Sequence, residues 1–210
     1  MKLIKRNKFK VVMTIIFIIL FTLLAFGFKD IIAVLKNDGA SKVEILDTIK
    51  KYEYTLDEND SAYFKKEFKK LKKELEKKNV NEEEYAKLVS KLFIIDFFSL
   101  NRVINKNDVG GKQFVYKDYQ ESFIKFAKDG IYKYVENNIY GDRKQDLPSV
   151  KLVTIDEIKQ EEVKFENDVI DAKAYVVELT INYDKDLEYQ DKATLVLIHN
   201  NNKLEIAKMD

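Results

Sequence analysis

The stretch FIIDFFSL, residues 93–100, is apolar except for Asp96 and Ser99. A helix that is apolar around its whole circumference has to be covered on every side. The stretch continues a helical pattern, because Tyr85, Leu88 and Leu92 recur at spacings of three and four before it. We therefore predict a helix over 82–104 at the centre of the domain, with Asn81 and Glu84 forming a capping box at its start.

Two more amphipathic patterns flank this central helix. Phe64, Phe68, Leu71 and Leu75 recur at spacings of four, three and four, which predicts a helix over 61–78. Asp60 or Ser61 is expected to cap its first turn. A third helix is predicted over 117–137, with one face formed by Tyr119, Phe123, Phe126, Ala127, Ile131, Tyr134 and Val135. Residues 42–56 have a period that fits a helix or a strand.

The C-terminal third of the chain alternates as strands do. Residues 174–183, AYVVELTINY, and 193–199, ATLVLIH, are the clearest cases, and 150–166 predicts another long strand. The NNN turn at 200–202 should join 193–199 to 203–209 as a hairpin. Helices followed by an antiparallel meander indicate the α+β class, with the helices packed on a curved antiparallel sheet.

The N-terminal region has a different character. Residues 11–28 read VVMTIIFIILFTLLAFGF, without a charge, and follow a basic stretch at 1–10. Eighteen residues span roughly 27 Å as a helix, close to the bilayer core. We expect a transmembrane helix, a cytoplasmic tail over 1–10, a linker over 29–41 and an exported domain over 42–210. A cleaved signal peptide, with Ala25 and Gly27 near the cleavage site, is the alternative, and it exports the domain as well.

These features carry three resemblances. The element order over 42–210 resembles the nuclear transport factor 2-like fold, a cone-shaped, cystatin-like family. That family includes isomerases, dehydratases, transport adaptors and secretion subunits, so the likeness implies a fold and selects no function. The whole-chain architecture looks like the bitopic assembly subunit of type IV secretion and Gram-positive conjugation systems. Residues 90–116 look like uncharacterised clostridial membrane proteins, and the Lys-, Ile- and Asn-rich composition fits a low-GC Gram-positive source.

The composition of the chain limits the kinds of site and partner that it can have. Charged residues make up 35% and hydrophobic residues 46% of the chain, which is typical of a folded domain. The net charge of +1 gives no pull toward nucleic acid, so we expect no nucleic-acid partner. The chain has no cysteine, which excludes disulfides, thiolate metal sites and a lipid-attachment cysteine. We expect neither a metal nor a cofactor.

Asp96 is the most informative polar residue, because it lies in phase with the apolar face of its helix. One hypothesis makes Asp96 the acid or base of a pocket, with Tyr85, Tyr119 or Tyr134 nearby. The alternative is a structural carboxylate paired with Arg102, Arg143 or loop backbone, or exposed to solvent. Burial of the phenylalanines at 93, 97 and 98 in the cone would argue against a pocket.

The loops offer weaker candidates. Asp108, Gly110 and Gly111 in NDVGG could point backbone N–H groups at an anion, or simply form a turn that requires glycine. Arg143 and Lys144 could dock an acidic partner. His199, the sole histidine, is expected at a strand end. The acids Asp156, Glu157, Glu161 and Glu162 are expected on a solvated edge.

Together these observations favour a non-enzymatic, membrane-tethered interaction or scaffold domain with an unknown membrane or envelope protein as partner. The lipid bilayer is the expected contact of residues 11–28, and self-association stays open. A small-ligand or enzymatic pocket around Asp96 is the alternative function.

Overall fold

The computed structural model describes residues 43–165 and 170–210. The predicted tail, transmembrane helix and linker, over 1–41, lie outside these described residues. Within the part of the chain that the structure describes, no helix combines the length and the apolar character needed to span a bilayer. Residues Val43–Asp210 form one compact unit.

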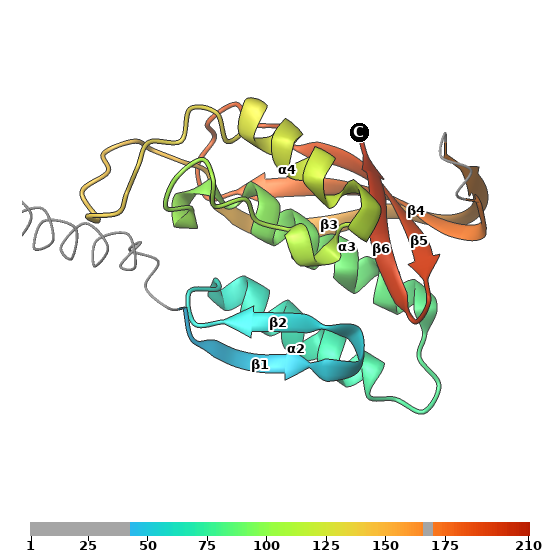
Figure 1. Ribbon diagram of the computed structural model, residues 1–210. Coiled ribbons are helices and arrows are strands. Elements are labelled where there is room, and N and C mark those ends of the chain that lie inside the picture. The colour runs from blue at the N-terminus through green and yellow to red at the C-terminus, as the bar shows by residue number, and fades with distance from the viewer. Residues whose placement is uncertain (1–42, 166–169) are drawn as a thin grey trace, which may run out of the picture. The chain divides into compact units, whose positions relative to one another are not determined.

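The described unit is α+β, as the sequence predicts, and its helices and curved antiparallel sheet are shown in Figure 1. Its main elements are β1 Ile45–Ile49, β2 Tyr54–Asp57, α2 Ala62–Leu75, α3 Glu82–Phe98, α4 Gln120–Asp129, β3 Val150–Lys164, β4 Ile170–Tyr183, β5 Lys192–Asn200 and β6 Lys203–Met209. The ambiguous segment 42–56 forms the hairpin β1–β2, with a short 3-10 turn at Lys50–Tyr52 and left-handed Glu53 between the strands.

Helix α3 lies at the centre of the domain, which confirms the prediction from FIIDFFSL. It packs against α2 on one side and against β3, β4 and β6 of the sheet on the other. Phe93, Ile94 and Ile95 have no exposed surface at all. Complete burial of successive residues is possible only because both flanks of the helix are covered.

The helix starts follow local chemistry. Ser61 caps α2 by accepting the Phe64 N–H at 3.0 Å, as predicted. Asn81 caps α3 by accepting the Glu84 N–H at 3.1 Å. The second half of the predicted capping box differs, because the Asn81 N–H is accepted at 2.9 Å by Glu74, from the preceding helix.

All three helices are shorter than predicted, and α2 covers only Ala62–Leu75 of the predicted 61–78. Helix α3 ends at Phe98, and Ser99 turns away so that its hydroxyl accepts the Val150 N–H at 3.2 Å. Helix α4 covers only Gln120–Asp129 of the predicted 117–137, because Gly130 has the non-helical angles φ −106° and ψ −113°. As a correction to the predicted apolar face, Tyr134 lies beyond the helix, and both it and Phe126 are exposed.

The four long strands form one antiparallel sheet in the order β3-β4-β5-β6, with the predicted hairpin between β5 and β6. Register shifts occur at three places along β3, and such bulges bend and twist a strand. One face of the sheet completes the main core. The other face holds a smaller apolar cluster formed by Ala174, Val176, Val196 and Ile198.

Candidate functional site

Asp96 points inward from α3 and has partners for both carboxylate oxygens. Oδ1 accepts a charged hydrogen bond from Arg102 Nη2 at 2.8 Å, and Oδ2 accepts the Gly111 N–H at 2.7 Å. Arg102 Nη1 donates to Asp60 Oδ1 at 2.9 Å. This is the structural arrangement that the sequence left as one of two alternatives, since Asp96 pairs with both Arg102 and loop backbone.

Opposing effects act on the pKa of the Asp96 carboxyl group. Burial raises the pKa of Asp96, while the positive charge of Arg102 and the Gly111 N–H oppose that rise. The adjoining cavity has a volume of about 170 Å³, below the several hundred Å³ of ordinary ligand pockets. Each oxygen of Asp96 is bonded within the fold, so the cluster holds the β2–α2 turn to the end of α3.

The NDVGG loop directs its backbone N–H groups inward. Gly110 N–H donates to Tyr132 Oη at 3.1 Å, and Gly111, with φ +79°, donates to Asp96. Of the two alternatives for this loop, the structure shows a glycine-containing turn whose Gly111 N–H binds the carboxylate of Asp96. Tyr132 Oη in turn donates to the Phe97 carbonyl at 2.6 Å.

The two tyrosines predicted to join Asp96 lie elsewhere. Tyr85 is buried with its Oη 2.7 Å from Tyr54 Oη, and it accepts the Leu204 N–H at 3.1 Å. Tyr134 is exposed on the segment after α4, under the ammonium group of Lys133. The structure therefore brings neither tyrosine to Asp96, and Phe93, Phe97 and Phe98 are buried in the core.

Tyr85→Phe should lower the free energy of unfolding by about 1–3 kcal/mol, because removing the hydroxyl leaves Leu204 N–H and Tyr54 Oη short of a buried partner. Burial raises the pKa of Tyr85 to about 12, so its hydroxyl stays protonated in the folded state at neutral pH. Urea unfolding of the full chain in detergent, followed by circular dichroism, measures the change. Tyr134→Phe is the matched control and should leave stability unchanged, and equal effects would refute the assigned role of Tyr85.

The side chain of Arg143 is bonded to the backbone of a neighbouring segment. Its Nη1 donates to the Val103 carbonyl at 2.7 Å, and its Nη2 donates to the Asn101 carbonyl at 2.8 Å. These bonds tie residues 141–146 to the segment after α3. Arg143 is therefore engaged within the fold, whereas Lys144, the other residue predicted to dock a partner, is exposed.

His199 has a partner that sequence reasoning missed. It lies at the end of β5, as predicted, and its Nδ1 is 2.8 Å from Asp171 Oδ2 of β4. No local sequence pattern signals this contact, because Asp171 and His199 are 28 residues apart. His199, Glu82 and Lys203 line a pocket of about 370 Å³, in which Glu82 Oε2 lies 3.8 Å from the histidine Nε2.

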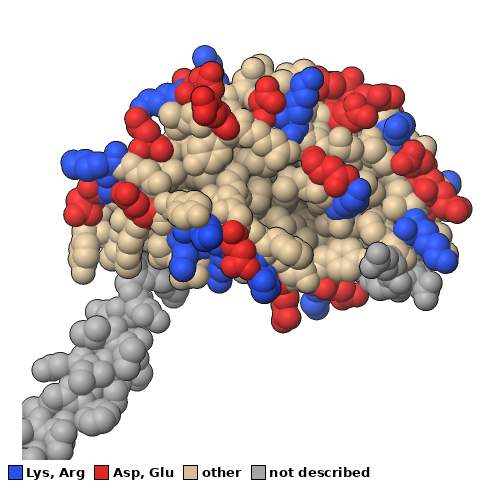
Figure 2. Space-filling view, turned by 90° about the horizontal axis from the view of Figure 1, so that it is seen from above, with Lys and Arg blue, Asp and Glu red and all other residues tan. Residues whose placement is uncertain are grey.

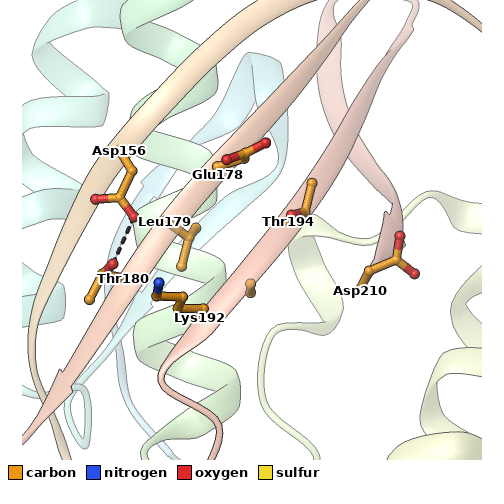
Figure 3. Close-up of a pocket in the computed structure, with 8 residues that line it drawn as sticks. Asp156, Glu178, Leu179, Thr180, Lys192, Thr194 and Asp210 are labelled. Carbon is orange, nitrogen blue, oxygen red and sulfur yellow. Dashed lines mark hydrogen bonds between the residues drawn. The ribbon is translucent and has the colours of Figure 1, made fainter.

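The face of the sheet opposite the main core holds a hollow of about 620 Å³ (Figure 3). Asp156 is the extra residue of a β3 bulge and accepts a 2.7 Å hydrogen bond from Thr180 Oγ1. Glu178, Lys192 and Asp210 also line this hollow. Asp156, Glu157, Glu161 and Glu162 are all exposed, as expected. Among residues 43–165 and 170–210, no group of three or more His, Cys, Asp or Glu side chains could hold a metal ion.

An apolar groove lies between α4 and β6. Its volume is about 220 Å³, and Phe93, Phe123 and Phe126 line it together with Ile206 and Met209 of β6. Phe126, on the wall of this groove, is 73% exposed. Figure 2 shows the face seen from above, where uncharged surface runs through the middle and side chains of both charges are mixed around it.

No protein-family model, curated protein or solved structure matches this chain.

Proposed function

We propose that the protein is a membrane-tethered, extracytoplasmic interaction domain that docks a protein partner in the α4–β6 groove. The observation that carries the proposal is Phe126, exposed beside an open groove lined by apolar side chains. Aromatic anchors next to small apolar hollows are typical of the centres of protein interfaces. The membrane tether rests on the apolar run at 11–28.

The groove fits an apolar segment of a partner. Lys208 is the one ionisable lysine, arginine or acid among its lining residues, and its ammonium is bonded to Asp210. An incoming apolar side chain therefore displaces water without stranding a charge. Tethering raises the effective concentration of such a groove for a partner in the same membrane. The sharpest form of the proposal is an assembly subunit of a secretion or conjugation complex in the envelope.

The test is site-specific photocrosslinking in intact cells that produce the full chain. A photoreactive residue at Ser122, an exposed position on the groove wall, should capture envelope proteins. Adding Phe126→Asp should abolish the adduct, because a carboxylate placed beside an apolar site opposes docking. Leu152→Asp is the matched control, since Leu152 is an exposed apolar residue on β3 and away from the groove.

Loss of the Ser122 adduct in Phe126→Asp alone, with a secretion or conjugation component identified in it, supports the proposal. An adduct that persists unchanged in Phe126→Asp counts against the groove as the docking site. Recovery of the protein without any partner would count against an interaction domain altogether.

A further inference from the structure

A second group of exposed apolar side chains lies away from the groove. On the segment between α4 and β3, Tyr134, Ile139 and Tyr140 are 75%, 53% and 89% exposed. At the start of the domain, Ile45 and Leu46 of β1 are 58% and 51% exposed. We call these five residues the entry surface, because the chain enters the described domain there.

A series of contacts connects the two parts of the entry surface. Glu44, beside Ile45, accepts the Glu58 N–H at 2.9 Å through its carbonyl. Two residues after Glu58, Asp60 binds Arg102. The segment after α3 in turn contacts the loop between α4 and β3, because Asn138 N–H of that loop donates to the Ile104 carbonyl at 2.8 Å.

Figure 1 agrees with these contacts, since the start of β1 and the segment between α4 and β3 both lie at the left end of the view. The hairpin end of β3 and β4 lies at the opposite end.

The loop presents its apolar residues on a defined backbone. Arg143 donates to three carbonyls, those of Asn101, Val103 and Glu136. Gln145 bonds to the main chain at Tyr134 and Glu136. Because these bonds already fix the loop, it loses less conformational entropy on binding than a flexible loop would.

The composition of the surface fits the boundary between water and lipid. Tyrosine rings are enriched there because they carry an apolar body and a polar tip. The ammonium of Lys133 lies 5.1 Å from the centroid of the Tyr134 ring, and lysine can keep its charge in water while its stem lies on apolar surface. From 130 to 149 the acids Glu136, Asp142 and Asp146 balance Lys133, Arg143 and Lys144, so contact would depend on apolar burial more than on anionic lipid.

We propose that the entry surface rests on the bilayer, with Tyr134, Ile139 and Tyr140 in the headgroup region and the α4–β6 groove left free for its partner. The inference depends on the membrane tether of the proposed function, because the chain reaches this surface from the apolar run at 11–28 through only the residues 29–42. Seating the entry surface on lipid orients the groove relative to the membrane.

The experiment uses the full chain in phosphatidylcholine vesicles that contain a lipid with a nitroxide-labelled headgroup. Because the chain has no cysteine, a fluorophore can be placed by Asp142→Cys, an exposed position beside the entry surface. The matched control is Glu162→Cys, exposed on β3 near its hairpin end. We expect several-fold stronger quenching at 142 than at 162, with little change when salt is raised. Adding Ile139→Ser and Tyr140→Ser should remove the difference.

Flotation of the same samples separates the two proposals. A chain that floats with the vesicles but is quenched equally at 142 and 162 keeps its tether and overturns the inference. A chain that fails to float overturns the tether and the inference together. A photoreactive residue at Tyr140 that captures a protein instead of lipid in cells would assign the entry surface to a protein partner and also overturn the inference.

Discussion

Replacing Arg102 by methionine is expected to lower the free energy of unfolding by about 3 kcal/mol. Arg102 is the cation shared by Asp60 and Asp96, whose side chains are only 9% and 16% exposed. Methionine fills much of the same space but leaves two mostly buried carboxylates without a counter-charge. The cost therefore comes from stranded anions, and little of it comes from lost packing.

Urea unfolding of the full chain in detergent measures this change, and Lys185→Met provides the control. Lys185 pairs with Asp146 at 2.7 Å, but both side chains are more than half exposed. An ion pair in that setting contributes almost nothing, so the control should unfold with the parent protein. If Lys185→Met and Arg102→Met were equally harmless, the Asp60–Arg102–Asp96 cluster could not be a structural support.

The defect should also depend on pH. Burial raises the pKa of Asp96 in the folded state above its ordinary value of 3.8. At pH values between the ordinary pKa and the raised pKa, the folded state therefore binds more protons than the unfolded state. Stability from this carboxyl group therefore falls as pH rises through that window. Losing Arg102 raises the pKa of Asp96 further, so the deficit of Arg102→Met relative to the parent protein should shrink as pH falls toward 3.8. A deficit that stayed constant with pH would argue against a stranded carboxylate.

Local patterns were enough to predict much of the fold. The cap at Ser61, the buried helix through FIIDFFSL and the β5–β6 hairpin each depend on residues close together in sequence. The end of α4 was predicted wrongly because Ile131, Tyr134 and Val135 continue the helical period past Gly130. Periodicity carries no information about the backbone angles at Gly130. It also does not show that the Tyr132 hydroxyl donates a hydrogen bond to the Phe97 carbonyl.

The candidate site was harder to predict because it depends on contacts across the chain. Asp96 and Arg102 are six residues apart, and that pairing was among the alternatives. Asp60 is 42 residues from Arg102, and Asp171 is 28 residues from His199. No local pattern joins such pairs. The exposure of Phe126 likewise depends on where β6 packs, which only the folded chain determines.

Gly110→Ala should destabilise the domain by at least about 3 kcal/mol, at the upper end of the cost of overpacking. A β-carbon at residue 110 would lie 2.2 Å from the Asp96 carbonyl oxygen and 2.8 Å from its carbonyl carbon. Those atoms belong to the backbone of α3 and cannot rotate away, so relief requires the NDVGG loop to move. That movement would pull Gly111 N–H from the Asp96 carboxylate and weaken the same cluster that Arg102 supports.

Gly141→Ala is the control that separates this clash from the general cost of losing a glycine. Gly141 has φ +72° but no atom within 4 Å of an added β-carbon. The alanine variant should therefore lose only about 1 kcal/mol of stability, from backbone strain. Urea midpoints of the two full-length variants in detergent should therefore differ clearly, with Gly110→Ala far lower. Similar midpoints would mean that the loop yields easily at residue 110, and that close contact between NDVGG and α3 does not hold Asp96 in place.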